Sequence, residues 1–482
     1  MKPHTILHSP FFICFRTLYK ILRMEIETMN VTDKAKVLAM TKVFDYVGKD
    51  PETNIPKVME FMDKIFKPEE FKPQRDVIRE ILSAPDNCWY KYLMGLWTDV
   101  DPDVLRAIFQ NFVINANFIG WPMQEKMREK YGCNIPWAIL LDPTSACNLH
   151  CTGCWAAEYG NRLNLSFDEI DSIIQQGKEL GTYLYIYTGG EPLVRKTDLI
   201  RLCEKHADCQ FLSFTNGTLI DEAFADEMLR VKNFFPAISV EGFETATDSR
   251  RGTGVFQRVV QAMELLKERK LPFGISCCYT SRNLDSISSE EYFDQMIAWG
   301  AKFVWFFHYM PIGNDAASEL LCSPEQRETM YRKIREYRTR KSIFAMDFQN
   351  DGEYVGGCIA GGRRYLHINA NGDVDPCVFI HYSDSNIREK TLLEALQSPL
   401  FMAYHDGQPF NDNHLRPCPM LENPQILRNM VHSVDCHSTD LQSPESVDHL
   451  CDKCESYAAN WKPTADRIWS CSHDCSQCGK KA

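Results

Sequence analysis

Three cysteines stand close together in the sequence as Cys147-x3-Cys151-x2-Cys154. Thiolates on such short spacings hold four-iron iron–sulfur clusters, and three of them leave one iron open to bind and activate another molecule. Zinc is the alternative, because His150 could complete a four-ligand zinc site with the same thiolates. The triplet therefore predicts a metal centre, and taken alone it leaves the choice between an open-iron cluster and a zinc ion undecided.

A second motif, Gly189-Gly190-Glu191-Pro192, ends the next predicted strand. Two glycines let the backbone approach a ligand closely, and a glutamate can accept a hydrogen bond from an ammonium group. A plain strand-to-helix turn is the alternative. Because the motifs follow neighbouring strands of one array, we expect them to meet at the same rim.

The segment that must position both motifs alternates strands and helices from residue 136 onward. Strands are predicted at residues 137–142, 183–187, 210–214, 235–240, 273–279 and 303–308, each followed by a helix. Strands that alternate with helices form a parallel sheet with right-handed crossovers. The six units predict an α/β fold, a partial, TIM-like (β/α)6 barrel, with its chemistry at the C-terminal ends of the strands.

The flanking segments have different patterns. Apolar residues recur at helical spacing in residues 31–135, which predicts an N-terminal helical domain before the barrel at 136–345. Residues 346–482 form a cysteine-rich extension with a hairpin at Asn371-Gly372 and an otherwise loop-rich tail. Residues 1–30 are interpreted as a leader or a mis-assigned start, with a basic amphipathic helix at a membrane surface as the alternative.

The two motifs in a six-unit array resemble the radical S-adenosylmethionine (SAM) superfamily over about residues 136–340. The resemblance implies a catalytic 4Fe–4S cluster on Cys147, Cys151 and Cys154 whose open iron binds SAM. Reductive cleavage of SAM would then give a 5′-deoxyadenosyl radical that abstracts hydrogen from a substrate. The implied SAM-binding residues are Gly189, Gly190 and Glu191 at the methionine amine, and Asn216, Ser239 and Glu241 near the carboxylate and ribose.

Ordinary turn and capping roles remain the alternative for Asn216, Ser239 and Glu241. The chain also departs from the family pattern at one position. The residue before the third cysteine is usually an aromatic that packs near the adenine, and here it is Gly153. The departure puts adenine packing in doubt and leaves the role of the triplet unchanged.

The C-terminal cysteines resemble the start of SPASM and twitch extensions, which hold auxiliary iron–sulfur clusters. The resemblance implies an auxiliary cluster on Cys358, Cys377 and Cys418, with a fourth position that is open or filled by Cys436, Cys451 or Cys454. Cys471, Cys475 and Cys478 repeat the triplet spacing, and with Cys451 and Cys454 they could hold another cluster or a zinc ion. No Gly-Gly-Glu-Pro motif accompanies this tail, so we expect no second SAM site.

Composition sets the remaining limits. The chain has 482 residues, of which 44% are hydrophobic and 24% charged, and this excludes a disordered or collagen-like protein. The net charge of −12, from 53 basic and 65 acidic residues, argues against sequence-independent nucleic-acid binding. No apolar run approaches the length of a membrane-spanning helix. The 20 cysteines, in short-spaced groups, indicate thiolate ligands in a reducing cytoplasm.

We therefore expect a cytoplasmic, anaerobic radical SAM enzyme of oxidoreductase or transferase type. Its substrate would be a peptide, a lipid or a cofactor precursor, and its electrons would come from a flavodoxin- or ferredoxin-type reductant. No nucleic-acid partner and no membrane-spanning segment are expected. Residues 1–30 are the segment through which peripheral contact with a membrane would occur. The alternative function is a non-catalytic iron–sulfur electron carrier or scaffold on a degenerate barrel.

Overall fold

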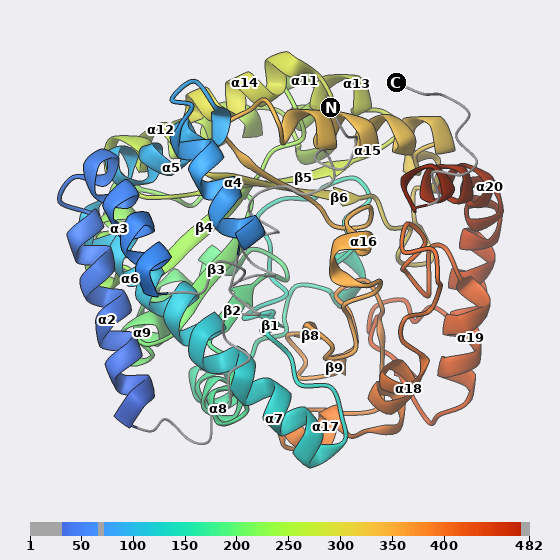
Figure 1. Cartoon of the computed structure of the whole chain (residues 1–482). Helices are drawn as coiled ribbons and strands as arrows, with labels where there is room; N and C mark the ends of the chain where they lie inside the picture. The colour runs from blue at the N-terminus through green and yellow to red at the C-terminus, as the bar shows by residue number, and fades with distance from the viewer. Residues whose placement is uncertain (1–30, 66–71, 474–482) are drawn as a thin grey trace.

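The computed structural model describes residues 31–65 and 72–473. Its centre is a nine-stranded sheet in the order β7-β6-β5-β4-β3-β2-β1-β8-β9, curled into a partial barrel with helices outside it (Figure 1). Neighbouring strands pair in parallel, except that β9 runs antiparallel to β8. The strands are β1 (Ala138–Leu141), β2 (Leu184–Tyr187), β3 (Gln210–Thr215), β4 (Phe234–Ser239), β5 (Gly274–Tyr279), β6 (Phe303–His308), β7 (Phe344–Asp347), β8 (Tyr365–Ile368) and β9 (Val374–Asp375).

All six predicted strands are present, and the sheet has more strands than the sequence predicted. Strand β7 was not predicted, and it is fixed by its parallel pairing with β6. Strand β8 pairs in parallel with β1, and the predicted hairpin joins it to β9. The cysteine-rich extension therefore continues the barrel sheet.

Six helices follow β1 to β6 and cover the outer face of the sheet: α8 (Phe167–Glu179), α9 (Lys196–Lys205), α10 (Glu222–Val231), α12 (Val255–Glu268), α14 (Glu290–Trp299) and α15 (Pro324–Tyr337). Shorter turns lie between them: α11 (Glu244–Arg251), α13 (Leu284–Ile287) and the 3-10 turns η2 (Ala157–Tyr159), η3 (Pro192–Arg195) and η4 (Ser318–Leu320). Successive strand residues point to opposite faces, so Ile139 and Leu141 belong to the core beneath the helices. Ala138 and Leu140 belong to a second core, which the barrel interior shares with the C-terminal extension.

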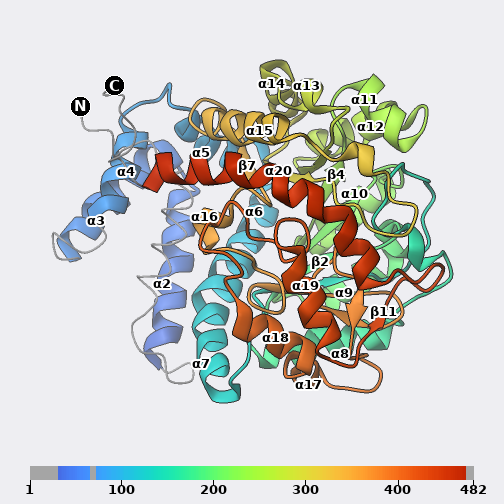
Figure 2. The ribbon, with the colours of Figure 1, turned by 90° about the vertical axis from the view of Figure 1, so that its right-hand side faces the viewer.

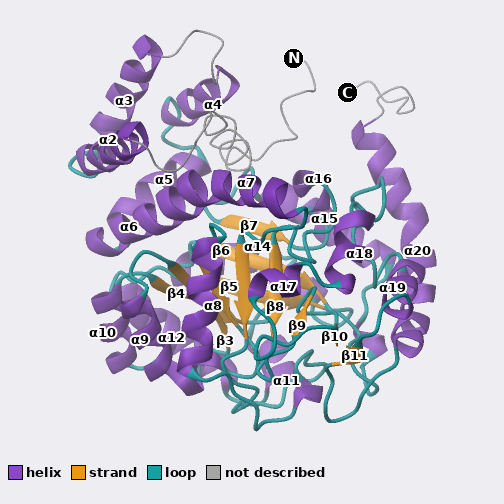
Figure 3. Cartoon of the chain, turned by 90° about the horizontal axis from the view of Figure 1, so that it is seen from below, coloured by secondary structure: helices purple, strands orange, loops and turns teal. Residues whose placement is uncertain are grey.

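The N-terminal helices close the end of the barrel at which the strands begin. They are α2 (Val31–Val47), α3 (Pro51–Ile65), α4 (Lys72–Leu82), α5 (Cys88–Asp99), and a continuous rod of α6 (Pro102–Ile108), the π-helical η1 (Phe109–Gly120) and α7 (Trp121–Tyr131). Asn111 donates to the carbonyl of Cys209 at 3.0 Å and Gln124 to that of Gly181 at 2.8 Å, just before β3 and β2. Helices α2 to α4 project beyond this rod (Figure 3).

The rod continues through Gly120 without a break, because Gly120 keeps a right-handed helical backbone. A side chain at Gly120 would overlap the carbonyl of Gly181, so the glycine allows the rod to pack directly on the loop before β2. A glycine is therefore needed at position 120 because two backbones approach closely there, and it does not mark the end of a helix.

The expectation of a loop-rich tail is wrong. The extension contains α16 (Gly352–Val355), α17 (Leu392–Leu396), α18 (Pro399–Gly407), α19 (Pro424–His432), the small sheet of β10 (Tyr382–Ser383) and β11 (His437–Ser438), and the 27-residue α20 (Val447–His473). Helix α20 contacts α19 and α15 (Figure 2). Its buried Leu450, Tyr457 and Trp461 lie on one helical face, a periodicity that the cysteine spacing obscured.

Candidate active site

The cysteine triplet occupies the loop after β1, at the C-terminal rim of the barrel. Cys147 is exposed, Cys151 and Cys154 are partly buried, and all three are free thiols. Burial, followed by the charges of Glu191 and of the other two thiols, raises the pKa of Cys147 to about 11. The structure therefore brings the three predicted ligands together, where a bound cation or cluster would favour their thiolate forms.

Two arginines and a glutamate hold this loop in place. Arg250 donates to Glu241 at 2.6 Å and to the carbonyl of Thr152 at 3.2 Å. Arg251 donates to the same oxygen of Glu241 and lies 3.9 Å from the sulfur of Cys151. The side chain of Glu241 is fully buried, and its second oxygen accepts from the backbone of Cys278 at 2.9 Å. These contacts give Glu241 a role in positioning the loop, and its predicted contact with SAM remains a prediction.

The Gly-Gly-Glu-Pro turn packs directly against the cysteine loop. Gly189 has φ of +102°, and a Cβ there would lie 2.8 Å from Asp142 and from the carbonyl of Thr144. A Cβ on Gly190 would overlap the backbone of Ala146. Only glycine fits at these two positions. The backbone of the turn contacts Ala146, the residue that precedes Cys147 in the sequence.

Glu191 and Asn216 are tied into the rim by their own hydrogen bonds. Glu191 is 1% exposed and accepts from the backbone amides of Leu193 at 2.9 Å and Asn216 at 2.7 Å. Burial raises the pKa of Glu191. The side chain of Asn216 donates to Asn148, directly after Cys147, at 2.8 Å. Both residues therefore connect the end of β3 to the cysteine loop.

Ser239, at the end of β4, is partly exposed on the barrel interior beside Ser276 of β5. Gly153 adopts φ of +65°, and a Cβ there would lie 2.6 Å from the ring of Tyr309. Tyr309 therefore occupies the space toward which a side chain at position 153 would point.

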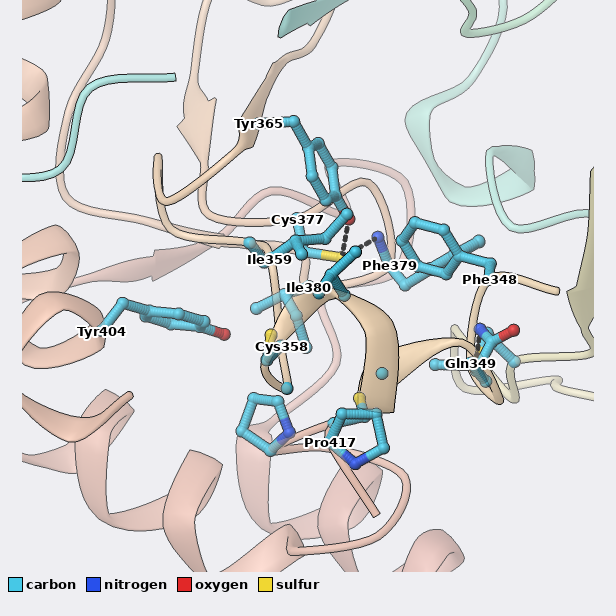
Figure 4. Close-up of a pocket in the computed structure, with 17 residues that line it drawn as sticks. Phe348, Gln349, Cys358, Ile359, Tyr365, Cys377, Phe379, Ile380, Tyr404 and Pro417 are labelled. Atoms are coloured by element: carbon cyan, nitrogen blue, oxygen red, sulfur yellow. Dashed lines mark hydrogen bonds between the residues drawn. The ribbon is translucent and has the colours of Figure 1, made fainter. Parts of the chain in front are cut away.

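A second set of cysteines surrounds a small cavity of about 50 Å³ in the extension (Figure 4). Cys358, Cys377 and Cys418 all line it, with Tyr365 and Tyr404 among the other lining residues. The hydroxyl of Tyr365 lies 2.7 Å from the sulfur of Cys377. Burial raises the pKa of Cys358 to about 11 and that of Cys377 to about 12. The structure thus gathers the three predicted auxiliary ligands around one space.

The other candidate ligands lie outside that cavity lining. Cys451 and Cys454 are buried on the first turns of α20, where the sulfur of Cys451 lies 3.2 Å from the carbonyl of Pro424. Cys436 is partly buried, and its sulfur lies 3.5 Å from the carbonyl of Val431. Cys471 is exposed on α20, and Cys475 and Cys478 lie outside the described residues.

Across residues 31–65 and 72–473, no group of three or more His, Cys, Asp or Glu side chains converges closely enough for a single metal ion. The two cysteine groups have the donor chemistry of iron–sulfur centres, which thiolates hold.

A buried array of imidazole and carboxylate side chains, which the sequence analysis did not predict, lies between the two cysteine sites. His367 lies 2.9 Å from Asp142 and 3.2 Å from Asp375, and His381 lies 2.5 Å from Asp440. Burial acts against the charged imidazole of His367, but the two carboxylates raise its pKa to about 9. Each of these side chains alone resembles an ordinary buried polar residue, so only the fold reveals the array.

Two known protein families match the segments of the chain that contain the two cysteine groups. Residues 141–293 match the radical SAM superfamily, and residues 358–420 match the SPASM iron–sulfur cluster-binding domain. The chain belongs to the radical SAM superfamily and carries a SPASM auxiliary-cluster domain. It is a radical SAM enzyme whose cofactors are SAM, the 4Fe–4S cluster and auxiliary iron–sulfur clusters. The predicted family, fold class, enzyme class and cofactors are confirmed.

Individual relatives differ in what they make. The AdoMet-dependent heme synthase of Methanosarcina barkeri is 25% identical over 290 residues, which cover 54% of this chain and 82% of the relative. The PqqA peptide cyclase of Granulibacter bethesdensis is 26% identical over 311 residues, which cover 60% and 80%. The crystal structure of Streptococcus suis SuiB bound to SAM shares the fold, with a TM-score of 0.53 and 18% identity over 69% of this chain and 81% of SuiB.

A further structure shows SuiB bound to its precursor peptide SuiA. No helix in the described part of this chain is long and apolar enough to cross a membrane.

Proposed function

We propose that Cys147, Cys151 and Cys154 hold the SAM-binding cluster. The observation that carries this assignment is the meeting of three free thiols with the Gly189-Gly190 turn and the buried Arg250–Glu241 pair at one rim. When bound, the cluster and SAM supply a 5′-deoxyadenosyl radical that removes hydrogen from a substrate. The protein's part is to hold the loop, orient the cofactor and exclude water.

The SAM-binding role of the remaining rim residues is part of the same proposal. Gly189 and Gly190 present bare backbone to the methionine amine, and Glu191 fixes that turn through its bonds to Leu193 and Asn216. Asn216, Ser239 and Glu241 lie around the same mouth, toward the carboxylate and ribose. Tyr309 supplies the aromatic surface for the adenine that position 153 lacks.

Cys358, Cys377 and Cys418 are proposed to hold the auxiliary cluster. Their support is the cavity that all three line, because a cluster needs both the thiolates and an enclosed space. The fourth position is open or is taken by Cys436, Cys451 or Cys454, each of which would have to approach from outside the present cavity lining. The domain limits 31–135, 136–345 and 346–482 stay predictions.

The reaction proposed is hydrogen abstraction from an organic substrate in the cytoplasm, with electrons from a flavodoxin- or ferredoxin-type reductant. The relatives include a heme synthase and a peptide cyclase, so similar sequences serve more than one substrate class. The proposed substrate is therefore a peptide, a lipid or a cofactor precursor.

The test is anaerobic reconstitution with iron and sulfide, reduction, addition of SAM, and measurement of 5′-deoxyadenosine. Cys147→Ala should abolish the product, whereas Cys203→Ala, which changes a buried thiol beneath the helices, should retain it. Separate Cys358→Ala and Cys418→Ala variants should lose iron while keeping the SAM-site cluster signal. Product formation by Cys147→Ala equal to the parent would refute the assignment.

A further inference from the structure

A continuous path of hydrogen bonds connects the auxiliary cysteine Cys418 to the loop that contains the radical-site cysteines. It begins at Glu422, a fully buried carboxylate. The backbone amide of Cys418 donates to one oxygen of Glu422 at 2.7 Å, and Arg327 of α15 donates to the other at 2.6 Å. Arg327 is also fully buried, so separating the pair would leave an uncompensated charge inside the protein. The position of Arg327 is therefore tied to the backbone at Cys418.

Two further side chains extend the path from Arg327 to the end of β6. The guanidinium nitrogen that contacts Glu422 also donates to the hydroxyl of Tyr457, on the neighbouring helix α20, at 3.1 Å (Figure 2). That hydroxyl lies 3.0 Å from Nε2 of His308, the last residue of β6. Nδ1 of His308 lies 2.6 Å from the carbonyl oxygen of Tyr309. The path thus ends at the C-terminal rim of the barrel.

The partners in this path fix where each proton lies. The carbonyl of Tyr309 can only accept, so Nδ1 of His308 carries a proton. Burial, followed by the charge of Arg327, lowers the pKa of His308 to about 3, so the imidazole is neutral and its Nε2 accepts. The hydroxyl of Tyr457 accepts from Arg327 and donates to His308. Reversing any of these bonds would leave a buried donor or acceptor unpaired, so the path is a rigid connection.

Tyr309 joins the path to the cysteine loop. Gly153 directly precedes Cys154, and a Cβ at position 153 would lie 2.6 Å from the ring of Tyr309. The backbone of Tyr309 is held on both sides, because its amide donates to the carbonyl of Tyr279 at 3.1 Å and its carbonyl accepts from His308. Close-packed groups transmit displacement to one another, so a shift of His308 reaches the cysteine loop through this ring.

We propose that Tyr457 and His308 are positioning residues that hold Tyr309 against the cysteine loop, and that through them SAM affinity depends on the auxiliary site at Cys418. The inference rests on the proposed function, in which this loop holds the SAM-binding cluster. Ligation at Cys418 fixes the backbone amide with which the path begins, and the path transmits that restraint to the loop. Coupling between two sites typically changes affinity by about 5–150-fold.

The first test is Tyr457→Phe, which breaks the middle of the path and keeps the aromatic ring. In equilibrium dialysis of the reconstituted holoenzyme, SAM should bind about fivefold or more weakly than to the parent. The matched control is Tyr187→Phe, which removes a buried hydroxyl that has no hydrogen-bond partner among the described residues, and it should keep the parent affinity. Equal SAM affinities of the two variants would overturn the proposal.

Amide hydrogen exchange in the metal-free protein gives a second readout that does not depend on cluster loading. Tyr457→Phe should accelerate exchange in residues 151–155 and leave β4 at the parent rate. His308→Asn should have the same effect, because asparagine keeps a donor for the Tyr309 carbonyl but is too short to reach Tyr457. Equal acceleration in both segments, or none in either, would show that the path does not hold the loop.

A double variant tests whether the auxiliary site acts through this path. Cys418→Ala alone should weaken SAM binding about fivefold or more, and it should add little to the effect of Tyr457→Phe. Effects that multiply in the double variant would mean that the two positions act independently, and the coupling would be refuted. The Cys147→Ala assay of SAM cleavage tests the proposed function by itself, so its failure is distinguishable from a failure of the coupling.

Discussion

Neutralising Glu241 should loosen the cysteine loop before it affects any other part of the barrel. Its carboxylate is fully buried, whereas the side chains of Arg250 and Arg251 retain 13% and 12% exposure. Both guanidinium groups pair with the same oxygen, and they are the main charges that lower the pKa of Glu241 against its burial. Glu241→Gln keeps the shape and an acceptor for Cys278, and it removes only the charge.

Breaking a buried ion pair by removing one partner costs about 3–5 kcal/mol, because the other charge is left uncompensated. The arginines keep some access to water, so we expect the lower end, about 3 kcal/mol. The loss should fall on the rim that contains Thr152 and Cys151, which the arginines contact. Amide hydrogen exchange in residues 146–155 should accelerate, and the reconstituted variant should hold less iron.

The control is Glu244→Gln, a change of the same type at an exposed residue three positions along the chain. It should leave the free energy of unfolding, the exchange rates and the iron content at the parent values. If Glu241→Gln matches this control in all three measurements, the buried ion pair does not support the loop, and the argument for its positioning role fails.

Three further perturbations test other parts of the molecule. Gly189→Ala should lose SAM affinity because its Cβ would press on Asp142. The control Gly254→Ala also has a positive φ, of +80°, but has open space around it and should keep its SAM affinity. Equal SAM affinity in the two variants would contradict the packing argument. Burial, followed by the charge of Asp351, raises the pKa of Asp347 to about 6. Between pH 4 and 6 the folded protein therefore keeps the proton on Asp347, which the unfolded chain loses near pH 4. The free energy of unfolding should therefore fall by up to about 3 kcal/mol between pH 4 and 6 relative to Asp347→Asn, and parallel pH profiles of the two proteins would disprove it. Arg327→Met leaves the fully buried Glu422 without its ion-pair partner and should lower the free energy of unfolding in urea by about 3–5 kcal/mol. The double variant Arg327→Met with Glu422→Leu should recover part of this loss. No recovery would mean that lost packing dominates.

The short-range motifs were predictable because their chemistry is local. Cys147, Cys151 and Cys154 lie within one loop, and the Gly189-Gly190 turn ends the neighbouring strand, so spacing and strand order were enough to bring them together. The contact of Arg251 with Cys151 joins residues 100 positions apart, and no pattern in either segment encodes it. The SAM-binding roles of individual rim residues stay predictions.

The packing of the barrel interior was hidden for a different reason. Alternation in β6 predicts one inward and one outward face, but the sequence does not say whether the inward face is filled. Filling depends on β5, where Gly274 lacks a side chain and the ring of its partner Phe303 lies in the space that a Cβ would take. Helix α20 was missed because its cysteine spacing suggested a metal-binding tail, although its apolar face packs on the rest of the protein.

The barrel and the auxiliary domain meet at Trp155, the residue after Cys154. Its ring lies 6.4 Å from Phe379 and 6.1 Å from His381, both on the segment that follows Cys377. One ring nitrogen of His381 faces the carbonyl of Val378 at 3.2 Å and must carry a proton, because a carbonyl only accepts; the other lies 2.5 Å from Asp440. Asp440 raises the pKa of this imidazole against its burial, and its contact with the ring fixes the segment after Cys377. A displacement of the auxiliary cysteine loop would therefore move His381 and Phe379 against Trp155, and through it the third cysteine of the radical site.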